Sequence, residues 1–271
     1  MCGADQEKNM MPPVEPPPDE AVLDLHKITV RFEGLEAISR LSFSIGPRRI
    51  VSIIGPNGAG KTTLLNAITG VYPLYDGEIL FQGKSISGLK PFQIAALGIT
   101  RSFQQVQLFM NMTVLENVMV GMHPLTTSGF LKGMFRLPSE RKEEAKISAR
   151  SREILDEFGL ISKAEDMAGH ISILDQRRLE IARAMAGQPR ILLLDEPAAG
   201  LTIREMESMG DLILRMREKG QTIILVEHNM RLVMAISDHL IVLHHGVKIG
   251  EGRPEDIQKD RNVIEAYLGK K

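Results

Sequence analysis

Eight consecutive residues, 55–62, place two glycines at fixed spacing ahead of a lysine and a threonine, the pattern of a phosphate-binding loop. The glycines let backbone N–H groups curl around the phosphates of a nucleotide at the start of a helix, where the helix dipole favours an anion. Lys61 supplies a positive charge to the β- and γ-phosphates, and the Thr62 hydroxyl is suited to ligate Mg²⁺. The residues predicted to hold a nucleoside triphosphate are Gly55, Pro56, Asn57, Gly58, Ala59, Gly60, Lys61, Thr62 and Thr63.

A second group of candidate residues follows the apolar run 191–194, which consists of Ile and Leu only. Asp195 and Glu196 come directly after it. Ligands of parallel sheets gather at the carboxyl ends of the strands, so we expect this pair beside the triphosphate. Asp195 would hold Mg²⁺ in its coordination shell, and Glu196 would polarise the attacking water.

Three further side chains complete the predicted site. His228 follows the apolar run 222–226 and would contact the γ-phosphate and the attacking water, the alternative being a purely structural histidine. The amide of Gln104 would reach the metal and the water. Phe32 is placed to stack on adenine, the alternative being an ordinary core phenylalanine.

The elements that must position these residues follow from the pattern around them. The run 50–54 is short and rich in β-branched residues, as a buried strand is, and residues 63–69 are typical of a helix that ends at Gly70. Alternation over 23–32, 41–45 and 79–81 predicts antiparallel strands, residues 91–186 read as helical, and strand–helix alternation returns after 189. The predicted fold is α/β: a P-loop NTPase core with a parallel sheet, an N-terminal antiparallel β subdomain and an α-helical subdomain at about 91–186.

Composition bounds the function. The 271 residues include 34 acidic and 33 basic side chains, which argues against bulk electrostatic binding to nucleic acid. The single cysteine excludes an internal disulfide, and no apolar run approaches the ~20 residues that cross a bilayer. Residues 1–20 form a proline-rich tail expected to be extended or disordered, ahead of a single domain at 21–271. Residues 128–137 predict a basic amphipathic helix that either packs on its own domain or touches lipid headgroups or a membrane subunit.

In this order, the aromatic residue, the phosphate loop, Gln104, the Asp–Glu strand and the late histidine resemble the ATP-binding subunit of an ABC transporter, over residues 21–268. Residues 176–184, 194–201 and 264–269 resemble more narrowly the subunits that serve branched-chain amino acid import. The insertion at 121–141 resembles the longer of that importer's two ATPase subunits. Related subunits serve urea, short-amide or lipopolysaccharide transport.

This resemblance implies an ATPase that uses ATP and Mg²⁺, with Glu196, His228 and Lys61 as catalytic residues and Thr62, Gln104 and Asp195 at the metal. It also implies two membrane permease subunits, a second ATPase subunit, and a periplasmic or extracellular solute-binding protein, but no nucleic acid. The subunit would be cytoplasmic, peripheral on the inner face of the plasma membrane. A soluble, non-transport ABC-type ATPase and a scaffold that does not hydrolyse ATP are the alternatives.

The resemblance further implies a dimer in which each ATP lies between the phosphate loop of one subunit and a signature segment of the other, usually Leu-Ser-Gly-Gly-Gln. The segment here retains the serine but has aliphatic side chains at both glycine positions: Ser172, Ile173, Leu174, Asp175 and Gln176. A leucine occupies space and restricts φ, so we expect a weakened contribution to the partner's ATP site. A dimer of two copies would have this defect at both ATP sites, whereas a dimer with a different ATPase would have it at only one. We therefore expect the second ATPase to be a different chain.

Overall fold

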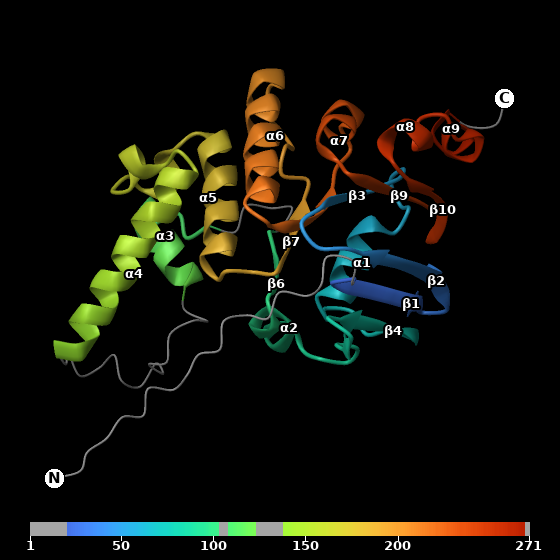
Figure 1. Cartoon of the computed structure of the whole chain (residues 1–271), viewed down its shortest axis with the longest axis horizontal. Helices are drawn as coiled ribbons and strands as arrows, with labels where there is room; N and C mark the ends of the chain where they lie inside the picture. The colour runs from blue at the N-terminus through green and yellow to red at the C-terminus, as the bar shows by residue number, and fades with distance from the viewer. Residues whose placement is uncertain (1–20, 103–107, 123–137, 269–271) are drawn as a thin grey trace, which may run out of the picture.

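The computed structural model describes residues 21–102, 108–122 and 138–268. The predictions for the tail at 1–20, for Gln104 and for residues 128–137 lie outside these ranges. Two sheets form the core, and Figure 1 shows them beside a group of helices formed by α3 (Val114–Gly121), α4 (Pro138–Glu157) and α5 (Ile173–Ala186).

The larger sheet has six strands in the order β10-β9-β3-β8-β7-β6, and all neighbours are parallel except β10 and β9. Every residue of β3, β7 and β8 is buried, as expected for parallel strands covered on both faces. Its strands are β3 (Ile50–Ile54), β6 (Ile99–Arg101), β7 (Ile191–Asp195), β8 (Thr222–Val226), β9 (His239–His244) and β10 (Val247–Gly252).

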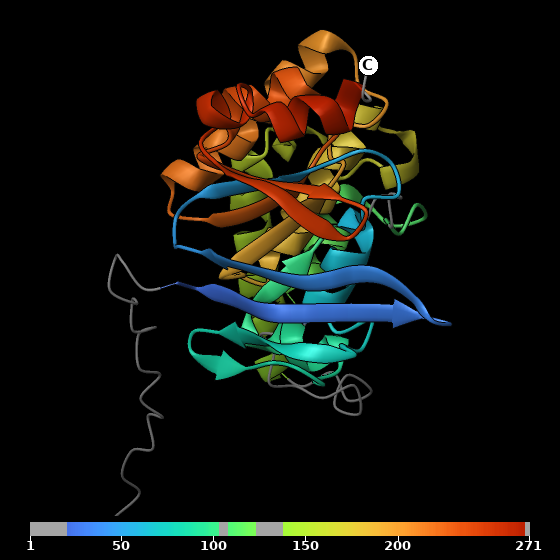
Figure 2. The same cartoon turned by 90° about the vertical axis from the view of Figure 1, so that its right-hand side faces the viewer.

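The smaller sheet is antiparallel, in the order β2-β1-β4-β5. Figure 2 shows its strands, blue to teal, beneath the orange and red C-terminal half. Leu25 of β1, Ile53 of β3 and Leu64 of α1 belong to one hydrophobic cluster, which joins the two sheets. The strands of the smaller sheet are β1 (Leu23–Phe32), β2 (Leu35–Ile45), β4 (Asp76–Phe81) and β5 (Lys84–Ser85). The predicted fold class is confirmed.

The helices cover the parallel sheet and extend to one side of it (Figure 1). Val118 of α3, Leu155 of α4 and Ile181 of α5 share a second cluster with the sheet residues on its other face. The helices are α1 (Lys61–Ile68), α2 (Pro91–Leu97), α3 (Val114–Gly121), α4 (Pro138–Glu157), α5 (Ile173–Ala186), α6 (Ile203–Glu218), α7 (Met230–Ile236), α8 (Pro254–Ile257) and α9 (Arg261–Leu268), with 3₁₀ turns η2 (Ile161–Lys163) and η3 (Ala168–His170). Among the described helices, none has the length and apolar composition of a membrane span.

One strand lies inside the range that the sequence pattern assigned to helices. β6 pairs in parallel with β7, with Ile99 opposite Ile191 and Arg101 opposite Leu193. Three residues are too short for an alternating pattern to reveal a strand. The range 91–186 therefore contains an edge strand of the parallel sheet as well as helices.

Candidate nucleotide site

The phosphate loop connects β3 to α1, and its backbone requires glycine at two positions. A Cβ on Gly55 would lie 2.1 Å from the carbonyl oxygen of Leu243, and one on Gly60 would lie 2.8 Å from that of Ala37. Gly60 has a φ of +100° and precedes α1 without a side-chain cap. No acidic residue lies in the first turn of α1, so its backbone N–H groups and dipole are available to an anion.

Lys61 is buried in this loop. Its Nζ donates to the carbonyl oxygens of Gly55 at 2.7 Å and Pro56 at 3.0 Å. Burial lowers the pKa of Lys61, and attraction to Glu196 and Asp195 opposes this shift. The lysine therefore shares an electrostatic environment with both predicted carboxylates.

Asp195 ends β7 and is only 1% exposed. Its Oδ2 accepts a hydrogen bond from the guanidinium of Arg101 at 2.5 Å, and the same guanidinium donates to Oδ1 of Asn66 on α1 at 2.5 Å. Arg101 thus fixes the carboxylate relative to the helix that begins at Lys61. No local sequence pattern marks Arg101 as part of this site, because its partner lies 94 residues away along the chain.

The residues present fit a hard metal ion. Oδ1 of Asp195 is buried and has no hydrogen-bond partner in the described part of the chain, an arrangement that costs free energy unless a ligand pairs with it. Thr62 offers a second oxygen from the exposed start of α1. Described residues 21–102, 108–122 and 138–268 contain no group of three or more His, Cys, Asp or Glu suited to a metal, so other ligands would be phosphate oxygens and water.

Glu196 and His228 face each other across the carboxyl ends of β7 and β8. His228 Nε2 lies 2.7 Å from Oε1 of Glu196, and the backbone N–H of Glu196 donates to the carbonyl of Val226 at 2.8 Å. Glu196 has a φ of +51°, a conformation uncommon outside glycine and often found at functional sites. The geometry brings together a carboxylate that can orient water and an imidazole that can donate to a phosphate.

Glu227 is a further residue of this site that the sequence analysis did not single out. It is 5% exposed, and its carboxylate accepts from the backbone N–H groups of Ala198 at 2.8 Å and His228 at 3.1 Å. Glu227 therefore links Ala198, in the turn after Glu196, to His228, which faces Glu196. Burial raises the pKa of Glu227, while backbone hydrogen bonds partly offset the shift. The sequence feature that could have identified Glu227 is its position directly after the apolar run 222–226.

Phe32 ends β1 and is 39% exposed, which excludes the reading as a core residue. Its ring packs edge-on against Tyr72, with the ring centroids 4.8 Å apart. A partly exposed aromatic ring of this kind is compatible with stacking on a base.

The signature segment is folded on itself at the start of α5. Oγ of Ser172 accepts from the N–H of Asp175 at 3.2 Å and donates to Oδ2 of the same residue at 2.7 Å, and Lys163 pairs with that carboxylate. Burial raises the pKa of Asp175, but the hydrogen bonds from Lys163 and Ser172 outweigh it and leave the pKa lowered. Leu174 packs on the helical cluster, whereas Ile173 is 58% exposed. The side-chain amide of Gln176 donates to the carbonyls of Ala168 and Ile171.

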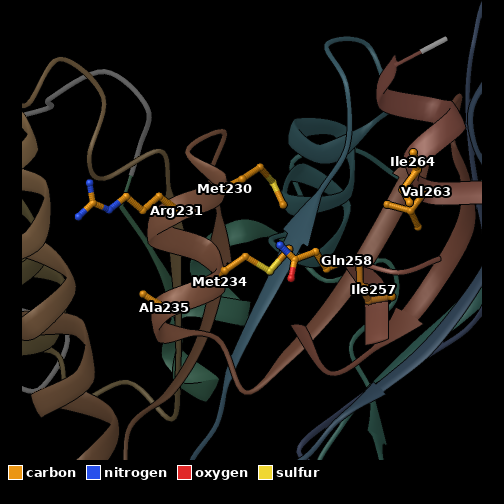
Figure 3. Close-up of a pocket in the computed structure, with 8 residues that line it drawn as sticks. All are labelled: Met230, Arg231, Met234, Ala235, Ile257, Gln258, Val263 and Ile264. Carbon is orange, nitrogen blue, oxygen red and sulfur yellow. The ribbon is translucent and has the colours of Figure 1, made fainter. Parts of the chain in front are cut away.

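An apolar cavity of about 660 Å³ lies between α7 and the C-terminal helices (Figure 3). Met230 and Met234 on α7 extend toward Ile257 and Gln258, with Val263 and Ile264 on α9 beyond them. It contains none of the predicted nucleotide-binding residues.

Comparison with known proteins agrees with this geometry. Residues 38–199 match the family described as "ABC transporter", and residues 247–271 match the one described as "Branched-chain amino acid ATP-binding cassette transporter". The chain is 43% identical over 251 residues to the high-affinity branched-chain amino acid transport ATP-binding protein LivG of Escherichia coli K12, covering 92% of this chain and 98% of the relative. BraF of Pseudomonas aeruginosa, with the same description, is also 43% identical, with the same coverage of both chains.

Solved structures show the same fold. A nucleotide-free ATP-binding cassette from an ABC transporter superposes with a TM-score of 0.81 at 31% identity, covering 93% of this chain and all of that one. A cassette crystallised in its ADP conformation gives the same values. The chain belongs to the ABC transporter family, as one of its ATP-binding, ATP-hydrolysing subunits.

Proposed function

We propose that this ATPase energises the import of branched-chain amino acids through separate membrane subunits. The names of the LivG and BraF relatives and the family matched at residues 247–271 support this substrate class. The subunit works on the inner face of the plasma membrane. Its partners are two permeases within the membrane and a solute-binding protein outside it. The observation that carries the hydrolytic part is the 2.7 Å contact between Glu196 and His228 next to the phosphate loop.

In this mechanism the N–H groups of residues 55–62 bind the phosphates, and Lys61 exchanges its loop carbonyls for the β- and γ-phosphate oxygens. Thr62 and Asp195 would hold Mg²⁺, which would supply positive charge to neutralise the charge that develops on the phosphates. Glu196 orients the attacking water, and His228 donates to the γ-phosphate. Gln104 would act at the metal and the water.

The membrane subunits dock, in this proposal, at a cavity of about 400 Å³ where α2, β6, α3 and α5 meet. Phe109 is 50% exposed there, and the guanidinium of Arg183 lies 5.7 Å from the centre of its ring. Arg101 lines the same cavity and holds Asp195. A subunit bound in this cavity would therefore contact the network that positions the metal ligand.

The test is ATP-dependent uptake into membrane vesicles that contain the assembled transporter. Leucine, isoleucine and valine should be taken up, and urea should not. A Phe109→Asp variant should reduce uptake at least tenfold while the isolated subunit binds ATP normally. Val247→Asp, at an exposed apolar residue of β10 outside the cavity, is the matched control. Uptake of urea in place of the amino acids would overturn the substrate assignment, and normal uptake by Phe109→Asp would overturn the docking site.

The second ATPase subunit, we further propose, is a different chain that retains glycines in its signature segment. Ser172 already uses its hydroxyl within this chain, and Leu174 is anchored in the helical cluster. Two copies of this chain would place such a segment at both ATP sites, whereas a heterodimer places it at one.

A further inference from the structure

A polar pocket of about 470 Å³ lies at the opposite end of the parallel sheet from the phosphate loop. Arg48, Arg49, Arg217, Asp238 and Arg253 line it. Arg48 and Arg49 directly precede β3, and the other end of this five-residue strand leads into Gly55. At about 3.3 Å per residue, the strand separates the pocket from the nucleotide site by roughly 17 Å.

The pocket combines four guanidinium groups with one carboxylate. These groups come from the turn before β3, the last turn of α6, the residue before β9 and the residue before α8, so they converge through the fold rather than through a basic run in the sequence. Convergence from four segments distinguishes the pocket from an ordinary charged helix face.

The single carboxylate is already committed. Oδ1 of Asp238 accepts from Arg217 at 2.7 Å, and Oδ2 accepts from the backbone N–H of Ile50 at 2.8 Å. Within the described residues, neither Arg49 nor Arg253 has an ion-pair or hydrogen-bond partner for its guanidinium. The pocket therefore keeps a positive excess that its own aspartate does not balance.

Several other arginines at the surface each pair with a single acidic residue. Arg150 pairs with Glu153 at 2.6 Å, Arg152 with Glu165 at 2.7 Å, and Arg231 with Glu207 at 3.0 Å. The chain as a whole has a formal net charge of −1. The positive excess is thus a local property of this pocket, and like charges held together repel one another unless an anion binds between them.

We propose that this pocket binds a phosphoryl group, on a soluble phosphorylated molecule or a lipid headgroup. The planar guanidinium matches phosphate oxygens with paired N–H donors, which a point charge does not. Arg49 and Arg253 contact the oxygens, while Asp238 orients Arg217 beside them. The site is separate from the ATP site and takes its ligand while nucleotide is bound.

Calorimetric titration of the full chain with pyrophosphate tests the proposal. ADP saturates the phosphate loop, and EDTA removes Mg²⁺ so that pyrophosphate cannot bind it. The wild type should bind about one further equivalent. Arg49→Gln together with Arg253→Gln should weaken this binding at least tenfold, while ADP affinity should not change and the melting temperature should not fall. Arg150→Gln together with Arg152→Gln, with the same loss of charge on α4, is the control and should change the affinity by less than twofold.

Sedimentation with vesicles identifies the source of the phosphoryl group. Capture by phosphatidylglycerol but not phosphatidylcholine vesicles, lost in the pocket variant and retained in the α4 control, assigns a lipid headgroup. Pyrophosphate binding without vesicle capture assigns a soluble ligand. If the wild type binds neither probe, or if the pocket variant binds both as the wild type does, the pocket is not a phosphoryl site.

Discussion

Two helices of this chain begin in opposite ways. α1 starts at Lys61 after a left-handed glycine, with no side-chain cap and no acidic residue in its first turn. α5 starts after Ser172, which caps it, and carries Asp175 in its first turn. Lys163 and Ser172 keep the pKa of this aspartate lowered, so it is ionised at the positive end of the helix dipole.

The difference decides what each helix can bind. The N–H groups at the start of α1 can bind an anionic ligand, because no side chain of the described residues caps them. At α5 a carboxylate already occupies the electropositive end, and the serine hydroxyl is used in the same contact. Of these two helix starts, α1 is therefore the open one, and we expect α5 to contribute only weakly to a partner's ATP site.

The largest effect should come from Glu196→Gln at the α1 end. Glutamine keeps the size but loses the negative charge that orients water, so turnover should fall by about 10²–10⁴-fold. ATP binding should persist, since Lys61 and the loop amides remain in place. Steady-state hydrolysis and equilibrium nucleotide binding measure the two effects. Lost binding, or turnover at the wild-type rate, would remove Glu196 from the role of general base.

The next largest effect should come from opening the α5 end. In the assembled complex, Ile173→Gly with Leu174→Gly should raise ATP turnover or tighten ATP-dependent dimer closure, because the backbone can then approach the phosphate. A recovered charge-assisted hydrogen bond corresponds to about 1.5–3 kcal/mol, or roughly one to two decades. Nucleotide binding to the isolated chain should not change. A double variant that equals the wild type in both turnover and closure would refute the asymmetry.

A smaller effect is expected from Glu227→Gln, which tests how the α1 site is supported. The carboxylate accepts from two backbone N–H groups, whereas an amide can accept at one oxygen only and leaves a buried donor unpaired. A loss of about 1.4 kcal/mol would slow turnover tenfold. ATP affinity should be retained, and Glu207→Gln, at an exposed residue of α6, is the control. Equal turnover in the two variants would contradict a positioning role for Glu227.

The sequence predicted what depends on local periodicity. The phosphate loop, the antiparallel strands and the apolar strands β3, β7 and β8 all follow from patterns within a few residues of one another. The proximity of Asp195 and Glu196 to Lys61 followed too, because parallel strands place their carboxyl ends at one edge of the sheet.

Contacts between distant segments could not be predicted. Arg101 meets Asp195 across 94 residues, and Glu227 meets Ala198 across 29, pairings that no periodicity encodes. At the signature segment, the sequence showed that the glycines are absent. The ion pair between Lys163 and Asp175 could not be predicted, because it depends on how η2 packs against α5. The catalytic roles of Glu196, His228 and Gln104 remain predictions.

The smallest effect concerns the stability of the α5 end and its dependence on pH. Asp175 has a lowered pKa in the folded chain, so below the unfolded value near 4 the unfolded state binds more protons than the folded one. The stabilisation by Asp175 is therefore present above about pH 4 and disappears as the pH falls through the folded pKa.

Asp175→Asn should lower the free energy of unfolding by about 1 kcal/mol at neutral pH, since Lys163 is partly exposed and the pair is screened by solvent. The difference between variant and wild type should shrink toward zero in acid. Denaturant unfolding between pH 3 and pH 7 measures it, with Asp166→Asn at an exposed neighbouring residue as the control. A constant difference across that range would mean that the charge of Asp175 does not close this helix end, and that Leu174 alone separates the two helices in function.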